Sequence, residues 1–87
     1  MNDVLSKAIR KFGFDMQQAI AIEEMSELTK ELCKYKRGAE NFKQIAEEIA
    51  DVEIMLEQLK IMFNCKRDVE VYREDKIKRL ADRLNNK

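Results

Sequence analysis

The chain has 87 residues, and its 17 basic side chains balance its 17 acidic ones. A chain of this length forms one domain, here residues 1–87, with a marginal core of its own, so self-association is expected. The zero net charge excludes a global field that attracts nucleic acid polymers. No window approaches the ~20 apolar residues of a membrane span. Two isolated cysteines without a signal peptide favour a reduced, cytoplasmic setting.

Helix is the expected state throughout, which predicts an all-α fold. The chain lacks proline and has glycine only at positions 13 and 38, where helices can end. Apolar residues at helical spacing predict a short first helix over residues 3–12. Asp15 and Gln18 have the spacing of a capping box and predict the start of a second helix, which runs to about Arg37.

The predicted second helix carries acidic residues along the border of its apolar face. Glu24, Glu27 and Glu31 occupy this border, whereas Glu23 sits further round toward solvent. A carboxylate at such a border can approach a neighbouring helix. Acidic residues at this spacing are also common on a solvated helix flank, so the pattern by itself leaves both interpretations open.

Asn41 followed by Gln44 indicates the cap of a third helix. The apolar residues of this helix step by three and four, which predicts a heptad seam packed against other helices: Ile45, Ile49, Val52, Leu56, Leu59 and Phe63. A second apolar stripe widens the face beyond what a small monomer buries, so an intersubunit contact is expected. Glu48 and Asp51 flank the seam while Glu47 points away, so geometry selects Glu48 as the partner of Asp51.

A polar break at residues 64–68 precedes a fourth helix, which is predicted to begin at position 68 or 69 and to end near position 84. Lys76, Arg79 and Arg83 form a basic stripe along this helix. Arginine and lysine on a fixed helix face can bind phosphate oxygens. The alternative is a solvated face in which these side chains form salt bridges.

Two acidic pairs on successive helices predict a carboxylate site. Residues three apart lie almost one above the other on a helix, so Glu24 and Glu27 project to one side. Glu48 and Asp51 do the same on the next helix. Oxygen ligands of this kind suit Mg²⁺ or Mn²⁺. Like charges about 4 Å apart repel by roughly 4 kcal/mol at an intermediate dielectric constant, so a metal ion, basic side chains or separation in solvent must compensate them.

The acidic residues follow the pattern E-E-x-x-E, a gap of 20 residues, then E-x-x-D. This pattern resembles the signature of the MazG-like all-α nucleoside triphosphate pyrophosphohydrolases. The likeness covers nearly the whole chain, including Phe12-Gly13-Phe14, the Gln17-Gln18 pair and the basic fourth helix. The resemblance implies a four-helix MazG-like bundle with a short first helix and antiparallel long helices. It also implies that oligomerisation, as a homodimer or homotetramer, completes the bundle.

The resemblance implies Mg²⁺-dependent hydrolysis of nucleoside triphosphates to monophosphate and pyrophosphate, with Mn²⁺ as a substitute. Four positions match the family's metal ligands: Glu24, Glu27, Glu48 and Asp51. Glu23 and Glu24 match catalytic positions, Glu23 as an additional ligand or as a group that orients water. Lys76 and Arg79 match a region that faces the phosphates in such enzymes.

Substrate choice, and the activity itself, have alternatives. A pocket between helices would select the base, and Gln17 or Gln18 is expected to hydrogen-bond the base edge. In related enzymes the substrate is narrower, such as dUTP or phosphoribosyl-ATP. A carboxylate-bridged di-iron bundle needs Glu-x-x-His, and the chain has no histidine. The chain could also be a non-catalytic helical interaction module whose acidic residues keep a heptad-bearing bundle soluble.

Overall fold

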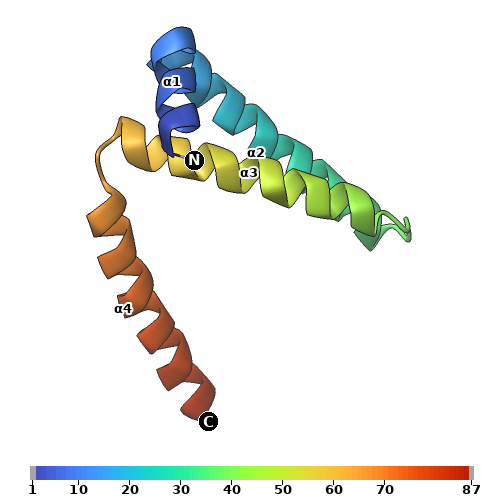
Figure 1. Ribbon diagram of the computed structural model, residues 1–87. Coiled ribbons are helices and arrows are strands. Elements are labelled where there is room, and N and C mark those ends of the chain that lie inside the picture. The colour runs from blue at the N-terminus through green and yellow to red at the C-terminus, as the bar shows by residue number, and fades with distance from the viewer. Residues whose placement is uncertain (1, 87) are drawn as a thin grey trace.

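The computed structural model of the protein describes residues 2–86 and contains four α-helices and no strand within that range. The helices are α1 (Asn2–Phe12), α2 (Phe14–Lys36), α3 (Phe42–Met62) and α4 (Lys66–Asn85) (Figure 1). The all-α prediction is therefore confirmed. α4 begins two or three residues earlier than predicted. In the described part of the chain, no helix is long and apolar enough to cross a membrane.

Gly13 alone separates α1 from α2. Its φ of 89° lies in the left-handed region, which glycine adopts without steric cost. The Gly13 amide donates to the Ile9 carbonyl at 2.8 Å, and the Gly13 carbonyl accepts from the Gln17 amide at 3.0 Å, so one residue ends a helix and begins the next. The predicted capping box is wrong, because α2 begins at Phe14 and Asp15 already lies in its first turn.

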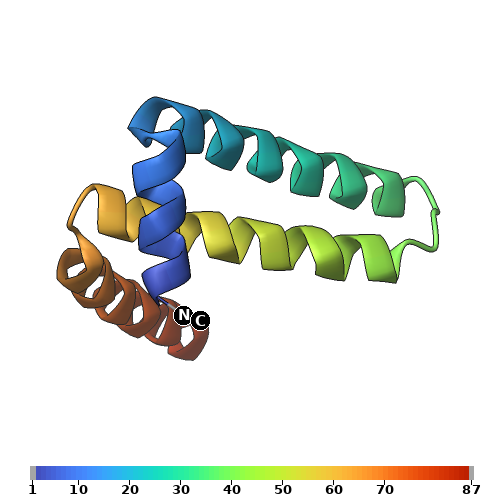
Figure 2. The same cartoon turned by 45° about the horizontal axis from the view of Figure 1, so that its top comes forward.

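α2 and α3 run antiparallel as a helical hairpin, and α1 lies across one end of the hairpin (Figure 1, Figure 2). The buried apolar side chains come from all three helices: Ile9, Ala21, Met55 and Met62. Ala21 is only 1% exposed, and its small side chain lets a neighbouring helix approach α2 closely. The core is therefore the contact between the hairpin and α1.

The predicted heptad seam of α3 is only partly correct. Met55 and Met62, which lie outside the seam, are buried, whereas Ile49 and Leu56 are each 43% exposed and Phe63 is 58% exposed. Because a helix turns by about 100° per residue, Leu56 and Phe63 lie about 100° round the helix from the methionines that precede them. α3 is thus rotated about its axis relative to the prediction. Three of the six seam residues, Ile49, Leu56 and Phe63, remain exposed in the single chain.

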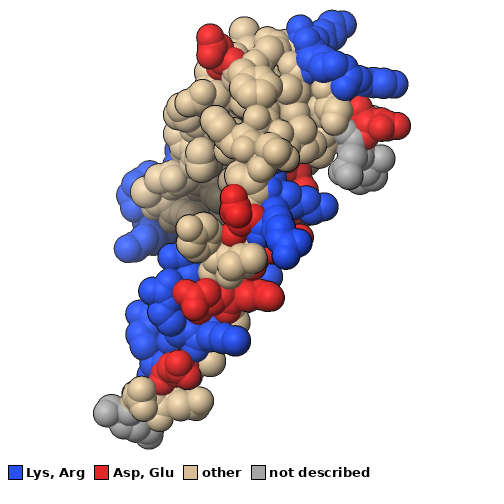
Figure 3. All heavy atoms as spheres, turned by 90° about the vertical axis from the view of Figure 1, so that its left-hand side faces the viewer, with Lys and Arg blue, Asp and Glu red and all other residues tan. Residues whose placement is uncertain are grey.

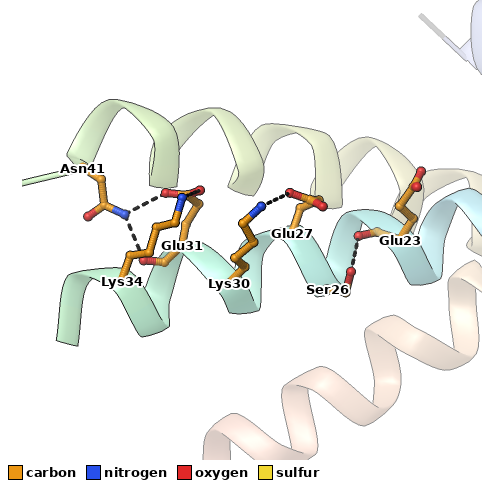
Figure 4. A network of polar contacts seen from close by, with 7 residues as sticks. All are labelled: Glu23, Ser26, Glu27, Lys30, Glu31, Lys34 and Asn41. Carbon is orange, nitrogen blue, oxygen red and sulfur yellow. Dashed lines mark hydrogen bonds and ion pairs between the residues drawn. The ribbon is translucent and has the colours of Figure 1, made fainter. Parts of the chain in front are cut away.

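Asn41 ties the start of α3 to α2. It occupies the predicted N-cap position but makes no capping hydrogen bond. Its Nδ2 instead donates to the backbone carbonyl of Glu31 at 2.9 Å and to Glu31 Oε1 at 2.8 Å (Figure 4). The hydrogen bond to Oε1 is the main cause of the lowered pKa of Glu31, and Lys34 adds to the effect. We call this contact the Asn41 clasp, and it fixes the loop end of the hairpin.

α4 contacts only α3 in the described chain and has no buried residue. It projects away from the hairpin (Figure 1) and carries basic and acidic side chains along its length, whereas the end where α1, α2 and α3 meet presents a broad uncharged area (Figure 3). The radius of gyration is 16.1 Å, against about 12 Å for a compact domain of this length. One chain therefore does not close a four-helix bundle.

Candidate metal centre

Three of the acidic residues singled out in the sequence converge where α2 and α3 face each other. Glu24 of α2 and Glu48 and Asp51 of α3 each offer one carboxylate oxygen, and these oxygens lie within 4.8 Å of one another. All three side chains are half-buried. Glu47, next to Glu48, is exposed and lies outside the group. We call Glu24, Glu48 and Asp51 the carboxylate cluster.

Two polar contacts hold α2 and α3 in the register that forms this cluster. Near the start of α2, Gln17 Nε2 donates to Gln58 Oε1 at 2.8 Å, and each of these two side chains is only 4% exposed. Near the end of α2, the Asn41 clasp joins Glu31 to the start of α3. Glu24 lies between the two contacts along α2, so its position opposite α3 is fixed from both ends.

Burial and mutual repulsion make the carboxylate cluster unfavourable without a counter-charge. Partial burial raises the pKa of Glu24, and three neighbouring carboxylates add to the increase: Asp51, Glu23 and Glu27. The pKa of Glu48 is also raised, first by burial and then by Asp51 and Glu24. Both shifts mean that the folded chain disfavours the ionised form, and a bound cation would reverse that preference.

The Glu48 Oε1 atom is buried and has no hydrogen-bond partner among the described residues. The ion pairs found between residues 3 and 86 do not include any member of the carboxylate cluster. Buried carboxylate oxygens in proteins are normally hydrogen-bonded, paired with a base or bound to a metal. This orphaned oxygen favours a cation site over a solvated helix flank.

The donor set fits a hard divalent cation. All donors are carboxylate oxygens, which suit Mg²⁺, Mn²⁺ and Ca²⁺, and the cluster contains no nitrogen or sulfur ligand. Two ligands on opposite sides of Mg²⁺, each about 2.1 Å from the ion, are about 4.2 Å apart. Oxygens within 4.8 Å of one another therefore need only small side-chain movements to share one ion.

Two further acidic residues lie beside the cluster. Glu27 Oε1 is 3.8 Å from Lys30 Nζ, and the Glu27 side chain is 43% exposed (Figure 4). Glu27 nevertheless contributes to the raised pKa of both Glu24 and Glu48. Because an exposed ion pair of this length is weak, the contact with Lys30 does little to hold the Glu27 carboxylate in place. Glu23 is exposed on α2 and lies outside the group, and its negative charge adds to the raised pKa of Glu24.

The structure does not bring the predicted substrate-binding residues to the cluster. Gln17 is buried against Gln58, so its amide does not face an open pocket. Lys76 and Arg79 line a groove on the surface of α4, and Arg79 pairs with Asp75 at 3.0 Å. Since α4 contacts only α3 in the described chain, the basic stripe of a single chain lies apart from the carboxylates.

Sequence reasoning missed the role of Gln58. Its position carried a usable signal, because Gln58 follows Asp51 by seven residues and therefore lies on the same face of α3. A polar residue there sits between two buried methionines, Met55 and Met62, and needs a buried partner. Gln17 supplies that partner from α2.

Comparison with known proteins does not assign the chain to a family. No family model matches the chain, and no curated protein or solved structure matches it either. The resemblance to the MazG-like enzymes therefore rests on the residues of this chain alone.

Proposed function

We propose that the protein hydrolyses (deoxy)nucleoside triphosphates to monophosphate and pyrophosphate with the help of Mg²⁺. The observation that carries the proposal is the convergence of Glu24, Glu48 and Asp51 around a buried carboxylate oxygen that has no protein partner. The two sequence segments that meet here are the same ones that resemble the MazG-like signature. A plain helix flank would need neither the convergence nor the burial.

The chain's own residues have distinct roles in this proposal. Glu24, Glu48 and Asp51 would hold the ion, and Glu27, which pairs with Lys30 in the structure, would be a fourth ligand. Mg²⁺, or Mn²⁺ in its place, would supply charge neutralisation of the triphosphate and a lower pKa for a bound water. Hydrolysis breaks one phosphoanhydride bond and forms one bond between phosphorus and the oxygen of water, and the protons of that water pass to the products or to solvent.

The remaining site residues act at the edges of the cluster. Glu23 lies outside the three ligands and serves as an additional ligand or orients the attacking water. Lys76 and Arg79 bind phosphate oxygens and offset charge on the departing pyrophosphate. Within one chain, α4 contacts α3 but not α2, and it lies apart from the carboxylate cluster. This role of α4 therefore requires a homodimer or homotetramer, in which α4 reaches the cluster of another copy. Free thiols at Cys33 and Cys65 are consistent with the proposed cytoplasmic location.

The test is an assay of pyrophosphate release from a panel of nucleoside triphosphates with and without Mg²⁺. The panel includes dUTP and phosphoribosyl-ATP, so that a narrow substrate range is distinguished from a broad one. We expect Mg²⁺-dependent release by the natural chain and by Glu47→Gln, and none by Glu48→Gln at unchanged helix content. Activity that survives Glu48→Gln would remove the cluster from the mechanism. Absence of hydrolysis on the whole panel would favour a non-catalytic interaction module.

A further inference from the structure

α4 carries apolar side chains on one side, and none of them is buried within the described chain. Their exposed fractions run from 36% for Val69 to 74% for Leu84, with Tyr72, Ile77 and Leu80 between these values. A helix in a protein owes most of its stability to the packing of its apolar face. The apolar face of α4 therefore needs a surface that covers it.

The charges of α4 are sorted in the same way. At 100° per residue, the apolar residues just named lie within a sector of about 160° that also contains four basic residues: Arg73, Lys76, Arg79 and Arg83. The acidic residues of the helix all lie outside this sector: Asp68, Glu70, Glu74, Asp75 and Asp82. We call the sector the basic apolar face of α4. An apolar surface with acidic flanks would complement it.

α3 presents such a surface across a groove that separates it from α4. The α3 wall of this groove includes Leu56, Glu53 and Glu57, and the α4 wall includes Arg73. Lys60 also lies on the α3 wall, but it is already 2.7 Å from Glu57 of its own helix. The ion pairs found in the described part of the chain do not join α3 to α4. The two walls are therefore complementary in charge but unpaired.

A link of three residues, Phe63–Cys65, joins the two walls. Asn64 has a φ of 51°, in the left-handed region. The amide of Asn64 donates to the Ile61 carbonyl at 3.2 Å, and the amide of Cys65 donates to the Lys60 carbonyl at 3.1 Å, which ends α3 sharply. Beyond this link, α4 projects away from the hairpin (Figure 1) and contacts only α3 among the described residues. Changes in the backbone torsions of a few residues there can change the angle between α3 and α4.

We propose that α4 is a closing arm, which turns about Phe63–Cys65 and packs its basic apolar face against the Leu56 side of α3 in the same chain. Two antiparallel helices joined by two to five residues are a common structural unit. The lengths match, since α3 has 21 residues and α4 has 20. The arm therefore extends along the whole of α3 when it closes.

The sequence sets the register of the closed form. Residues that are equally distant from Asn64 lie opposite one another in such a pair, so Leu56 lies opposite Tyr72 and Ile49 lies beside Leu80. These contacts cover apolar side chains of α3 that are exposed in the open form, because Ile49 and Leu56 are each 43% exposed there.

The same register pairs the charges of the groove. The positions opposite Glu57 and Glu53 are 71 and 75, and Arg73 lies midway between them. Its guanidinium group can therefore bond either carboxylate in the closed form. Apolar contacts and opposite charges thus favour closure in one and the same register.

Closure also regulates the candidate site, and this part of the inference rests on the proposed function. A closed arm holds Lys76 and Arg79 on the Leu56 side of α3, about 140° round the helix from Asp51. The basic stripe is then withheld from the cluster of another copy, while the carboxylate cluster of its own chain stays open to Mg²⁺. The closed chain is the inactive form, and release of the arm activates it.

The test measures closure by chemical linking of two cysteines. In a Cys33→Ser, Cys65→Ser background, Ile49→Cys and Leu80→Cys are joined by a reducible thiol reagent that spans about 10 Å, the distance between packed helices. The matched control pairs Glu47→Cys with Leu80→Cys. Glu47 is exposed and lies at nearly the same height on α3, about 160° round the helix from Ile49.

We expect links within one chain to form about tenfold faster or more for the Ile49 pair than for the Glu47 pair, because closure raises the local concentration of the two thiols. The mass after denaturation separates links within a chain from links between chains. Equal rates for the two pairs, or links only between chains, would overturn the proposal.

A charge exchange tests the register. Arg73→Glu places a negative charge between Glu53 and Glu57 and should slow linking of the Ile49 pair about fivefold. Adding Glu53→Arg should restore much of the rate. Circular dichroism checks that helix content is unchanged. Linking that is unaffected by Arg73→Glu would also overturn the proposal.

The linked chain tests regulation separately. It should lose hydrolysis but keep its stabilisation by Mg²⁺, and reduction of the link should restore hydrolysis. Hydrolysis that is equally fast before and after reduction would overturn the regulatory part. If the natural chain hydrolyses none of the triphosphates, the proposed function fails, whereas the ratio of linking rates still decides whether the arm closes.

Discussion

Replacing Asp51 by asparagine should have opposite effects on stability without and with Mg²⁺. Two unit charges 4.8 Å apart repel by about 0.9 kcal/mol in water and by about 3.5 kcal/mol at an effective dielectric constant of 20. Asp51 is half-buried and solvent screens part of its charge, so we expect relief of about 1 kcal/mol in metal-free protein. In a domain of this size, that gain raises the melting temperature by about 4–8 °C.

Mg²⁺ should reverse this order. At a concentration about 100 times its dissociation constant, a ligand that binds only the folded state stabilises it by about 2.7 kcal/mol. The natural chain therefore gains about 10 °C or more, while Asp51→Asn, which lacks one ligand, gains little. Thermal unfolding by circular dichroism at one fixed protein concentration measures both effects.

Glu47→Gln is the matched control, because it removes one negative charge from the same helix outside the cluster. It should respond to Mg²⁺ as the natural chain does. Equal stabilisation of Asp51→Asn and the natural chain would refute the metal centre. An equal loss in Glu47→Gln would show that Mg²⁺ acts on the general acidic surface instead.

The geometry gives four more predictions. Gln17→Leu alone leaves the buried amide of Gln58 without its partner and should cost about 1–3 kcal/mol in urea unfolding, whereas Gln17→Leu with Gln58→Leu should be close to neutral; additive costs would contradict a specific pair. Without metal, the stability advantage of Glu48→Gln should grow as pH rises above the ordinary value of 4.5 through the raised pKa of Glu48, because the folded state disfavours the ionised form. Mg²⁺ affinity of the natural chain should rise over the same pH range, and pH-independent binding by titration calorimetry would argue against carboxylate ligands. If α4 acts on a partner's cluster, mixing inactive Glu48→Gln with an inactive Lys76→Ala, Arg79→Ala double variant should restore hydrolysis in mixed dimers, and no recovery after exchange would place α4 elsewhere.

The pH dependence of overall stability combines opposing contributions. The pKa values of Glu31 and Glu57 are lowered by hydrogen bonds from Asn41 and Lys60, so their contribution is present above pH 4.5 and is lost as pH falls below it. The raised pKa of Glu48 works in the other direction. A comparison of variants, rather than one curve for the natural chain, is therefore needed to isolate the cluster.

The amino-acid sequence by itself determined the helices and which residues share a face. Absence of proline, the two glycines and the apolar periodicity place all four helices, because backbone propensity and turn chemistry are local properties. The i, i+3 spacing also put Glu48 beside Asp51 and left Glu47 outside, since helical geometry alone decides this.

Only the tertiary structure decided which of the two apolar sides of α3 the chain uses for itself. The apolar periodicity of α3 is compatible with burial of either Met55 or Leu56. Which of the two is buried depends on the rotation of α3 about its axis relative to α2. That rotation is set by contacts between residues that are not neighbours in the sequence. The main ones are the hydrogen bond between Gln17 and Gln58 and the Asn41 clasp. The same contacts bring Glu24 to the α3 carboxylates, whereas Glu27 pairs with Lys30 of its own helix. Periodicity can place Gln58 on the same face of α3 as Asp51, but it does not identify Gln17 as the partner. The sequence pattern could therefore indicate the acidic site but not its final membership.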